Sequence, residues 1–206
     1  MARVIACADA RPASRCGPQT QPVYAMLVRL LWCCGLRIGE ALSLRVGDVD
    51  LAEAVITVRK AKHHRTRLVP MSASLVAHAR TYAVAVSLVA EDPGGWFFPS
   101  PRGGGYNPSS ATAHIQGLML EAGVTTASGR APRSHDLRHS YAVACLAKMQ
   151  ADRVDVYAAL PLLATYLGHA DMVSAEYYLR LDPSAWADID QAMEHTYAGV
   201  FPQETV

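Results

Sequence analysis

The sequence predicts a mainly α-helical fold with a small antiparallel β-sheet, which places the chain in the α+β class. Apolar residues recur at helical spacing over long stretches, beginning with Val23, Met26 and Leu30. Two short β-branched segments, 55–58 and 67–70, predict the strands of a hairpin. With 206 residues, 51% of them hydrophobic and 18% charged, the chain can bury a core within one domain.

The first helix is expected to begin near Pro22 and to end at Gly35, a residue suited to the C-cap region. A second short helix follows it. Residues 1–20 mix Arg, Ala, Cys and Pro without periodicity, so we expect an irregular leader there and a domain over 21–206.

Further helices are predicted along the rest of the chain. Ala, Val and Leu dominate 74–89, and a helical pattern also covers 109–122. Ser134 stands where the N-cap of another helix belongs, and the last helix is expected over about 183–197.

Composition excludes some classes of function. No apolar run is long enough to cross a bilayer and no charged-then-apolar leader opens the chain, so we expect a cytoplasmic protein without a membrane partner. The net charge of +1 does not by itself indicate a nucleic-acid binder. Residues 59–67 hold five basic residues and two histidines, which alone would be typical of a solvated hairpin tip. The two histidines, His63 and His64, have no further ligands at metal-binding spacing, so no metal site is predicted.

Two arginines lie in contexts suited to one phosphate. Arg37 is part of GLRIGEAL and Arg138 is part of HDLRH. The planar fork of arginine donates two parallel hydrogen bonds to a phosphodiester and keeps its charge. His135 and Arg138 share a helix face in a first turn, where free backbone amides favour an anion. Residues so placed are ordinarily surface or capping residues, so this pair alone is a weak signal.

A third segment, LGHADMVSAEYY at 167–178, completes a set that resembles the signature boxes of the tyrosine recombinases, the phage integrase family. The resemblance covers about 22–193 and implies the fold of their catalytic domain. It also implies a site-specific DNA recombinase or integrase, which cleaves and rejoins strands through a 3′-phosphotyrosyl intermediate. This chemistry needs neither a cofactor nor a metal ion.

The resemblance assigns catalytic roles, residue by residue, to Arg37, Lys62, His135, Arg138, His169 and Tyr178. The two arginines and His169 would hold the non-bridging oxygens of the phosphate. Lys62 would protonate the leaving 5′-oxygen, and His135 would assist proton transfer at the nucleophile, Tyr178.

Two of these assignments have a competitor. Lys62 follows from counting back from segment 67–70, but the turn lacks the usual glycine, so Lys60 is the alternative. Tyr178 stands nine positions after His169, as the family nucleophile does, and Tyr177 is adjacent to it. Helical neighbours point about a third of a turn apart, so only one of these tyrosines can face the phosphate.

Other residues are expected to support the site. Glu40 would orient Arg37 from one turn away. The alternative is that Glu40 is an exposed helix residue with no special role. Asp136 is expected to support the second box. DNA contacts are expected from Arg59, Lys60, His63, His64, Arg65, Arg67 and Arg133.

The resemblance implies double-stranded DNA as partner and a homotetramer when strands are exchanged. A C-terminal helix around 186–193 would be lent to a neighbour or docked on its own domain. Family members place a DNA-clamping domain before the catalytic one. Its absence here predicts a fragment, a truncated gene or a deliberately excised domain, of bacterial, phage or mobile-element origin, that binds DNA weakly. The alternative functions are a type IB topoisomerase-like strand cleaver and an inactive, DNA-binding remnant of an integrase.

Overall fold

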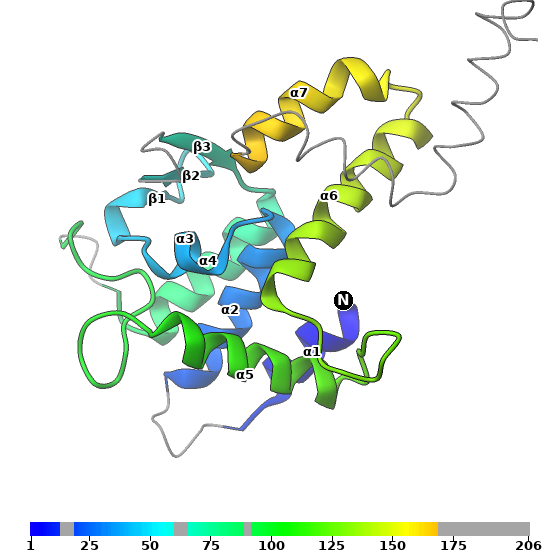
Figure 1. Ribbon diagram of the computed structural model, residues 1–206. Coiled ribbons are helices and arrows are strands. Elements are labelled where there is room, and N and C mark those ends of the chain that lie inside the picture. Colours follow the sequence, from blue (N-terminus) through cyan, green and yellow to red (C-terminus); the bar gives the residue numbers. More distant parts are fainter. Residues whose placement is uncertain (13–18, 60–65, 89–91, 169–206) are drawn as a thin grey trace, which may run out of the picture. The chain divides into compact units, whose positions relative to one another are not determined.

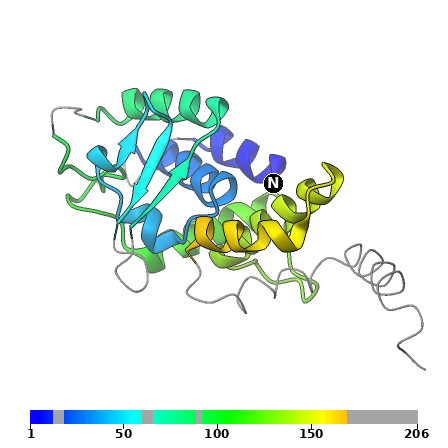
Figure 2. The same cartoon turned by 90° about the horizontal axis from the view of Figure 1, so that it is seen from above.

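The computed structural model describes residues 1–12, 19–59, 66–88 and 92–168 (Figures 1 and 2). It divides into two compact units. The first comprises 1–141 together with 166–168, and the described part of the second is 142–165. The predicted helix over 183–197 therefore lies outside the described residues.

Helices dominate the described residues, and one small sheet accompanies them, so the predicted fold class is confirmed. In chain order the elements are α1 (Ala2–Ala10), α2 (Thr20–Cys33), α3 (Ile38–Leu42), the 3₁₀ turn η1 (Val46–Asp48), β1 (Val49–Asp50), β2 (Val55–Val58), β3 (Arg67–Pro70), α4 (Ala73–Ala85), α5 (Pro108–Glu121), α6 (Ser134–Ala151) and α7 (Val156–Leu167). None of the helices within these ranges has the length and apolarity that crossing a membrane requires.

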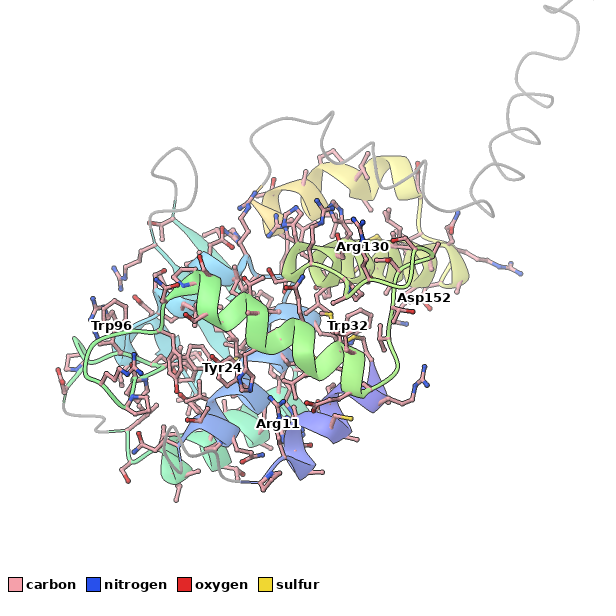
Figure 3. The ribbon with its side chains drawn as sticks, turned by 60° about the horizontal axis from the view of Figure 1, so that its bottom comes forward. Arg11, Tyr24, Trp32, Trp96, Arg130 and Asp152 are labelled. Carbon is pink, nitrogen blue, oxygen red and sulfur yellow. The ribbon has the colours of Figure 1, made fainter. Side chains whose placement is uncertain are left out.

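Helix α2 forms the centre of the first unit, and it contacts α1, α3 and α4. Its residues are apolar on nearly every side, which is typical of a helix enclosed by others. Tyr24 of α2 stacks on the ring of His114 in α5, with the ring centroids 3.7 Å apart. Figure 3 shows Tyr24 and Arg11 beside α5, the green helix. Arg11, the residue that follows α1, also contacts His114, so one side chain of α5 contacts both α2 and the end of α1.

The sheet is antiparallel in the order β1-β2-β3. Strands β2 and β3 pair from Val55 opposite Pro70 to Val58 opposite Arg67, so the predicted hairpin is confirmed with its boundaries. The two-residue strand β1 was not predicted, because two residues carry no periodicity. Both views of the molecule place the strands on the side of the first unit away from α1 (Figures 1 and 2). Arg67 of β3 donates to Glu40 of α3, so the hairpin lies beside α3.

The prediction of an irregular leader over 1–20 is wrong for its first half. Helix α1 covers Ala2–Ala10, and Val4 and Ala8 are buried. These two residues are four apart, so they lie on the face that packs against α2 and α5. An ion pair between Asp9 and Arg29, with two N–O contacts of 2.6 and 2.8 Å, fastens the helix to α2. The helix was missed because its burial depends on contacts with α2 and α5, which so short a stretch of sequence does not reveal.

Candidate active site

The turn between α2 and α3 begins the candidate site. Helix α2 ends at Cys33, and Gly35 adopts a left-handed φ of +59°, so its predicted C-cap role is confirmed. A Cβ atom at Gly35 would lie 2.6 Å from Cδ1 of Tyr141 and 2.9 Å from Cδ2 of Leu167. Only glycine satisfies both the backbone angle and this close packing.

Helix α3 is one turn long and is held by its first residues. Arg37 is its N-cap, and the backbone nitrogen of Arg37 donates to Oε2 of Glu40 at 2.9 Å. Nη1 of Arg37 donates to Oε1 of the same carboxylate at 2.8 Å. The side chain of Glu40 is only 8% exposed, so the alternative of an exposed, idle Glu40 is wrong. These two bonds fix the orientation of the Arg37 side chain at the start of α3.

Glu40 is also bound by an arginine from the sheet. Nη1 and Nη2 of Arg67, the first residue of β3, donate to Oε1 and Oε2 of Glu40 at 3.0 and 2.8 Å. Burial alone would raise the pKa of Glu40, but the hydrogen bonds from Arg67 and Arg37 outweigh it and hold the pKa at about 2. The carboxylate is therefore ionised throughout the physiological range.

Arg138 enters the same cluster from α6. Its side chain is fully buried, and its Nη1 lies 3.9 Å from Oε2 of Glu40. Nη1 donates to the carbonyl oxygen of Gly35 at 2.7 Å, and Nη2 donates to the carbonyl oxygen of Leu167. A buried guanidinium needs such partners, because an unpaired charge in the interior is costly. The hydrogen bond to Gly35 thereby joins the second signature segment to the first.

Three consecutive carbonyl groups at the end of α7 accept from the three arginines. Tyr166 accepts from Nε of Arg67 at 2.8 Å, and Gly168 accepts from Nη2 of Arg37 at 3.2 Å. The third, Leu167, is the partner of Arg138. Gly168 has a φ of +69°, and a Cβ atom there would lie 2.8 Å from Nη1 of Arg67. The Leu-Gly of the third signature segment is thus packed directly against the arginines.

Helix α6 presents His135 in its first turn. The helix begins at Ser134 itself rather than after it, so the predicted N-cap is displaced by one residue. Asp136 performs the capping, since it accepts from the backbone nitrogen of Arg133 at 2.8 Å and from its Nη2 at 3.1 Å. Partial burial lowers the pKa of His135, and the charges of neighbouring basic residues lower it further. The imidazole is therefore neutral at neutral pH and able to accept a proton.

Comparison with known proteins agrees with this geometry. Residues 12–185 match the family model described as "Phage integrase family". This chain belongs to the phage integrase family. It is 37% identical over 162 residues to y4rE of Sinorhizobium fredii, named as an integrase or recombinase, covering 75% of this chain and 50% of the relative. It is 30% identical over 178 residues to the tyrosine recombinase XerC of Alcanivorax borkumensis, covering 86% and 52% respectively. The chain spans about half the length of these relatives.

Solved structures of recombinases and of an integrase share the fold. The XerA recombinase superposes with a TM-score of 0.70 at 25% identity, covering 98% of this chain and 61% of that one. The catalytic domain of bacteriophage HP1 integrase gives a TM-score of 0.55 at 22% identity, covering 92% and 89%. XerH bound to palindromic difH substrate gives 0.70 at 20% identity, covering 94% and 50%. The latter two likenesses concern the fold alone.

Several residues that the sequence assigned to an integrase-family site are not among those described. They are Lys60, Lys62, His63, His64, Arg65, His169, Tyr177 and Tyr178. Of the other DNA-contact candidates, Arg133 is 75% exposed, and Arg59 is 62% exposed and paired with Asp48. Arg67 differs from them, because its side chain is 9% exposed and its contacts are internal. This geometry favours an internal role for Arg67 over the DNA contact expected from the sequence.

The cluster carries an excess of positive charge. Three guanidinium groups surround the single carboxylate of Glu40, which leaves two unbalanced positive charges at one place. Arg37, whose side chain is 29% exposed, brings this charge to the surface. Within the described ranges, no three His, Cys, Asp or Glu side chains gather as metal ligands would. The arrangement of this integrase-family site is suited to binding an anion through arginine.

Proposed function

We propose that this chain is the catalytic domain of a site-specific DNA recombinase, which cleaves and rejoins strands through a 3′-phosphotyrosyl intermediate. The observation that carries the proposal is the convergence of Arg37 and Arg138. Arg37 precedes α3 and Arg138 lies in α6, yet both approach Glu40 and donate to the adjacent carbonyl groups of Gly168 and Leu167. Two arginines held in fixed positions beside each other are what a scissile phosphate requires.

The arginines would stabilise the transition state. When a phenol oxygen attacks phosphorus, negative charge accumulates on the two non-bridging oxygens. The hydrogen bonds of Arg138 to Gly35 and Leu167 fix the plane of its guanidinium before substrate binds. Glu40 does the same for Arg37. Preorganised charge of this kind lowers the barrier, because nothing has to reorient during the reaction.

Proton transfer would complete the chemistry. The phenol of Tyr178, with an ordinary pKa of about 10, loses its proton as its oxygen bonds to phosphorus. The neutral imidazole of His135 is suited to accept that proton. Lys62, or its competitor Lys60, would donate a proton to the departing 5′-oxygen. His169 would donate a hydrogen bond to the phosphate. The 3′-phosphotyrosyl ester keeps the bond energy, so rejoining by a 5′-hydroxyl needs no nucleotide cofactor.

The proposed substrate is double-stranded DNA, and the proposed assembly during strand exchange is a homotetramer that exchanges C-terminal helices. The Tn1549 transposon integrase, which shares the fold, was solved in complex with transposon right end DNA. The proposed compartment is the cytoplasm, where chromosomal and mobile-element DNA lies. Catalysis by arginine would make the reaction independent of divalent metal.

A covalent trapping experiment tests this function. The chain would be incubated with nicked duplexes of pooled sequence in EDTA and then denatured. A protein–DNA adduct that depends on Arg37, and is absent in Arg37→Ala, is the expected result. Cleavage confined to a few sequences would distinguish a recombinase from a topoisomerase-like enzyme, which would cleave throughout the pool. An adduct that requires divalent metal would contradict the proposed mechanism.

A further inference from the structure

The buried ion pair between Arg67 and Glu40 connects the sheet to the phosphate-binding arginines. We propose that Arg67 is a positioning residue, which holds the Glu40 carboxylate and the 166–168 turn so that Arg37 and Arg138 can meet one phosphate. This role rests on the proposed function, since it concerns the same site. It differs from a DNA contact, because Arg67 would act through Glu40 and never touch the substrate.

The contacts of Arg67 support an internal role. All three of its guanidinium nitrogens donate to protein oxygens: Nε to the Tyr166 carbonyl, and Nη1 and Nη2 to the two carboxylate oxygens of Glu40. Its side chain is 9% exposed, and both of its Nη atoms are held by the Glu40 carboxylate, whereas those of the fully buried Arg138 are held by backbone carbonyl groups. Gly168, which has no Cβ, leaves the room that the guanidinium fills. Three hydrogen bonds therefore fix the guanidinium group of Arg67.

Arg67 shares the Glu40 carboxylate with Arg37 and Arg138, and this sharing reduces the negative charge that those two arginines face. Oε1 of Glu40 accepts from both Arg37 and Arg67, and Oε2 accepts from Arg67 while lying 3.9 Å from Arg138. Without Arg67, the full charge of Glu40 would face Arg37 and Arg138 and compete with phosphate for them. Arg67 thus balances a carboxylate that orients the site but would otherwise weaken anion binding.

The geometry requires arginine rather than positive charge alone. The fork of Arg67 spans both oxygens of Glu40 while its Nε reaches the Tyr166 carbonyl. A lysine ammonium is a single point charge and cannot make these three bonds in one plane. Arg67→Lys should therefore keep the charge and lose the positioning, which provides a variant that separates the two effects.

Titration with inorganic phosphate tests the role without requiring catalysis. Arginine Nε–H signals of the full chain would be followed by NMR in the wild type, in Arg67→Lys, and in Glu40→Gln with and without Arg67→Lys. We expect phosphate to shift the signals of Arg37 and Arg138. Arg67→Lys should weaken phosphate binding about tenfold, which is the scale of one lost charged hydrogen bond. In the Glu40→Gln background, Arg67→Lys should lose most of that effect, because its route to the site is already removed.

Arg29 provides the matched control. It is also 9% exposed and forms a two-pronged ion pair, with Asp9, but it joins α1 to α2. Arg29→Lys should lower the unfolding midpoint about as much as Arg67→Lys does and leave phosphate affinity within twofold of the wild type. Equal losses of affinity in both variants would show a general folding effect and overturn the proposal.

Two further outcomes would overturn it. One is direct contact between Arg67 and phosphate. It would appear as a phosphate-induced shift of the Arg67 signal in the wild type, together with an undiminished effect of Arg67→Lys on phosphate affinity in the Glu40→Gln background. The other is unchanged affinity in Arg67→Lys. Loss of phosphate binding in Arg67→Lys, in a chain that forms no DNA adduct, would support the positioning role while refuting the recombinase function. The two claims can therefore fail separately.

Discussion

The carbonyl oxygen of Gly35 accepts a hydrogen bond of 2.7 Å from Nη1 of Arg138, which is 103 residues later in the chain. This bond joins the first signature segment to the second. Because Arg138 is fully buried, the bond contributes to stability as well as to the geometry of the site. Substitutions here should therefore affect folding and catalysis together.

Arg138→Met should abolish cleavage and lower the free energy of unfolding by about 3 kcal/mol, the scale for breaking a buried charged network. The substitution removes the donor to the carbonyl groups of Gly35 and Leu167. Urea unfolding measures the stability loss. Arg133→Met is the comparison, since that side chain is 75% exposed. Its stability should stay within about 0.5 kcal/mol of the wild type. A similar loss in both variants would contradict this account of Arg138.

Gly35→Ala should destabilise the protein by about 2–4 kcal/mol, since a positive φ and overpacking both oppose a Cβ atom at this position. That atom would lie 2.6 Å from Cδ1 of Tyr141. Gly39→Ala is the matched change within α3, where a Cβ atom has nothing within 4 Å. It should stabilise by about 0.5–1 kcal/mol, because alanine is the better helix former. Thermal unfolding of both variants would decide, and a tolerated Gly35→Ala would show that the turn can relax.

Stability should depend on pH through Glu40. Its pKa falls from an ordinary 4.5 to about 2 on folding, so the unfolded chain binds this proton more tightly than the folded one. The resulting stabilisation, on the order of 3 kcal/mol, is complete above pH 4.5 and disappears as the pH falls towards 2. The difference in unfolding free energy between wild type and Glu40→Gln should shrink over the same interval. A difference independent of pH would contradict the assignment of the charge to Glu40.

The general acid can be identified by changing the leaving group. A 5′-bridging sulfur leaves as a thiolate, whose conjugate acid has a far lower pKa than an alcohol, and it needs little protonation. Cleavage of such a duplex should be nearly normal in Lys62→Ala, although cleavage of the ordinary phosphodiester is lost. Lys60→Ala, tested in parallel, should show no such selective rescue. Rescue of the Lys60 variant instead would exchange the two assignments.

The sequence predicted local features well because their causes are local. The four β-branched residues of β2 placed that strand correctly, β3 was expected as its hairpin partner, and the backbone demand at Gly35 ended α2 as expected. Helix α1 was missed, because its burial depends on contacts with α2 and α5 that no nine-residue pattern reveals. Propensity is a weak guide where tertiary packing determines the element.

The site was predictable only in part, for a similar reason. Resemblance pointed to Arg37, Glu40 and Arg138 as residues of one site, and the structure brings them together. The internal contacts of Arg67 were not foreseen, because a basic residue beside a basic hairpin tip is expected to face DNA. Its partners, Glu40 and the Tyr166 carbonyl, lie 27 and 99 residues away in the chain. The residue types within the strand gave no indication of these distant partners.

Mapping the trapped adduct tests the central claim most directly. The wild-type chain, cross-linked to nicked duplex DNA by its own chemistry, would be digested and analysed by mass spectrometry for a nucleotide-bearing tyrosine. We predict that the nucleotide is attached through its 3′-phosphate to Tyr178, that Tyr178→Phe forms no adduct, and that Tyr177→Phe still does. Attachment to Tyr177, or an adduct that survives in Tyr178→Phe, would contradict this account of the nucleophile.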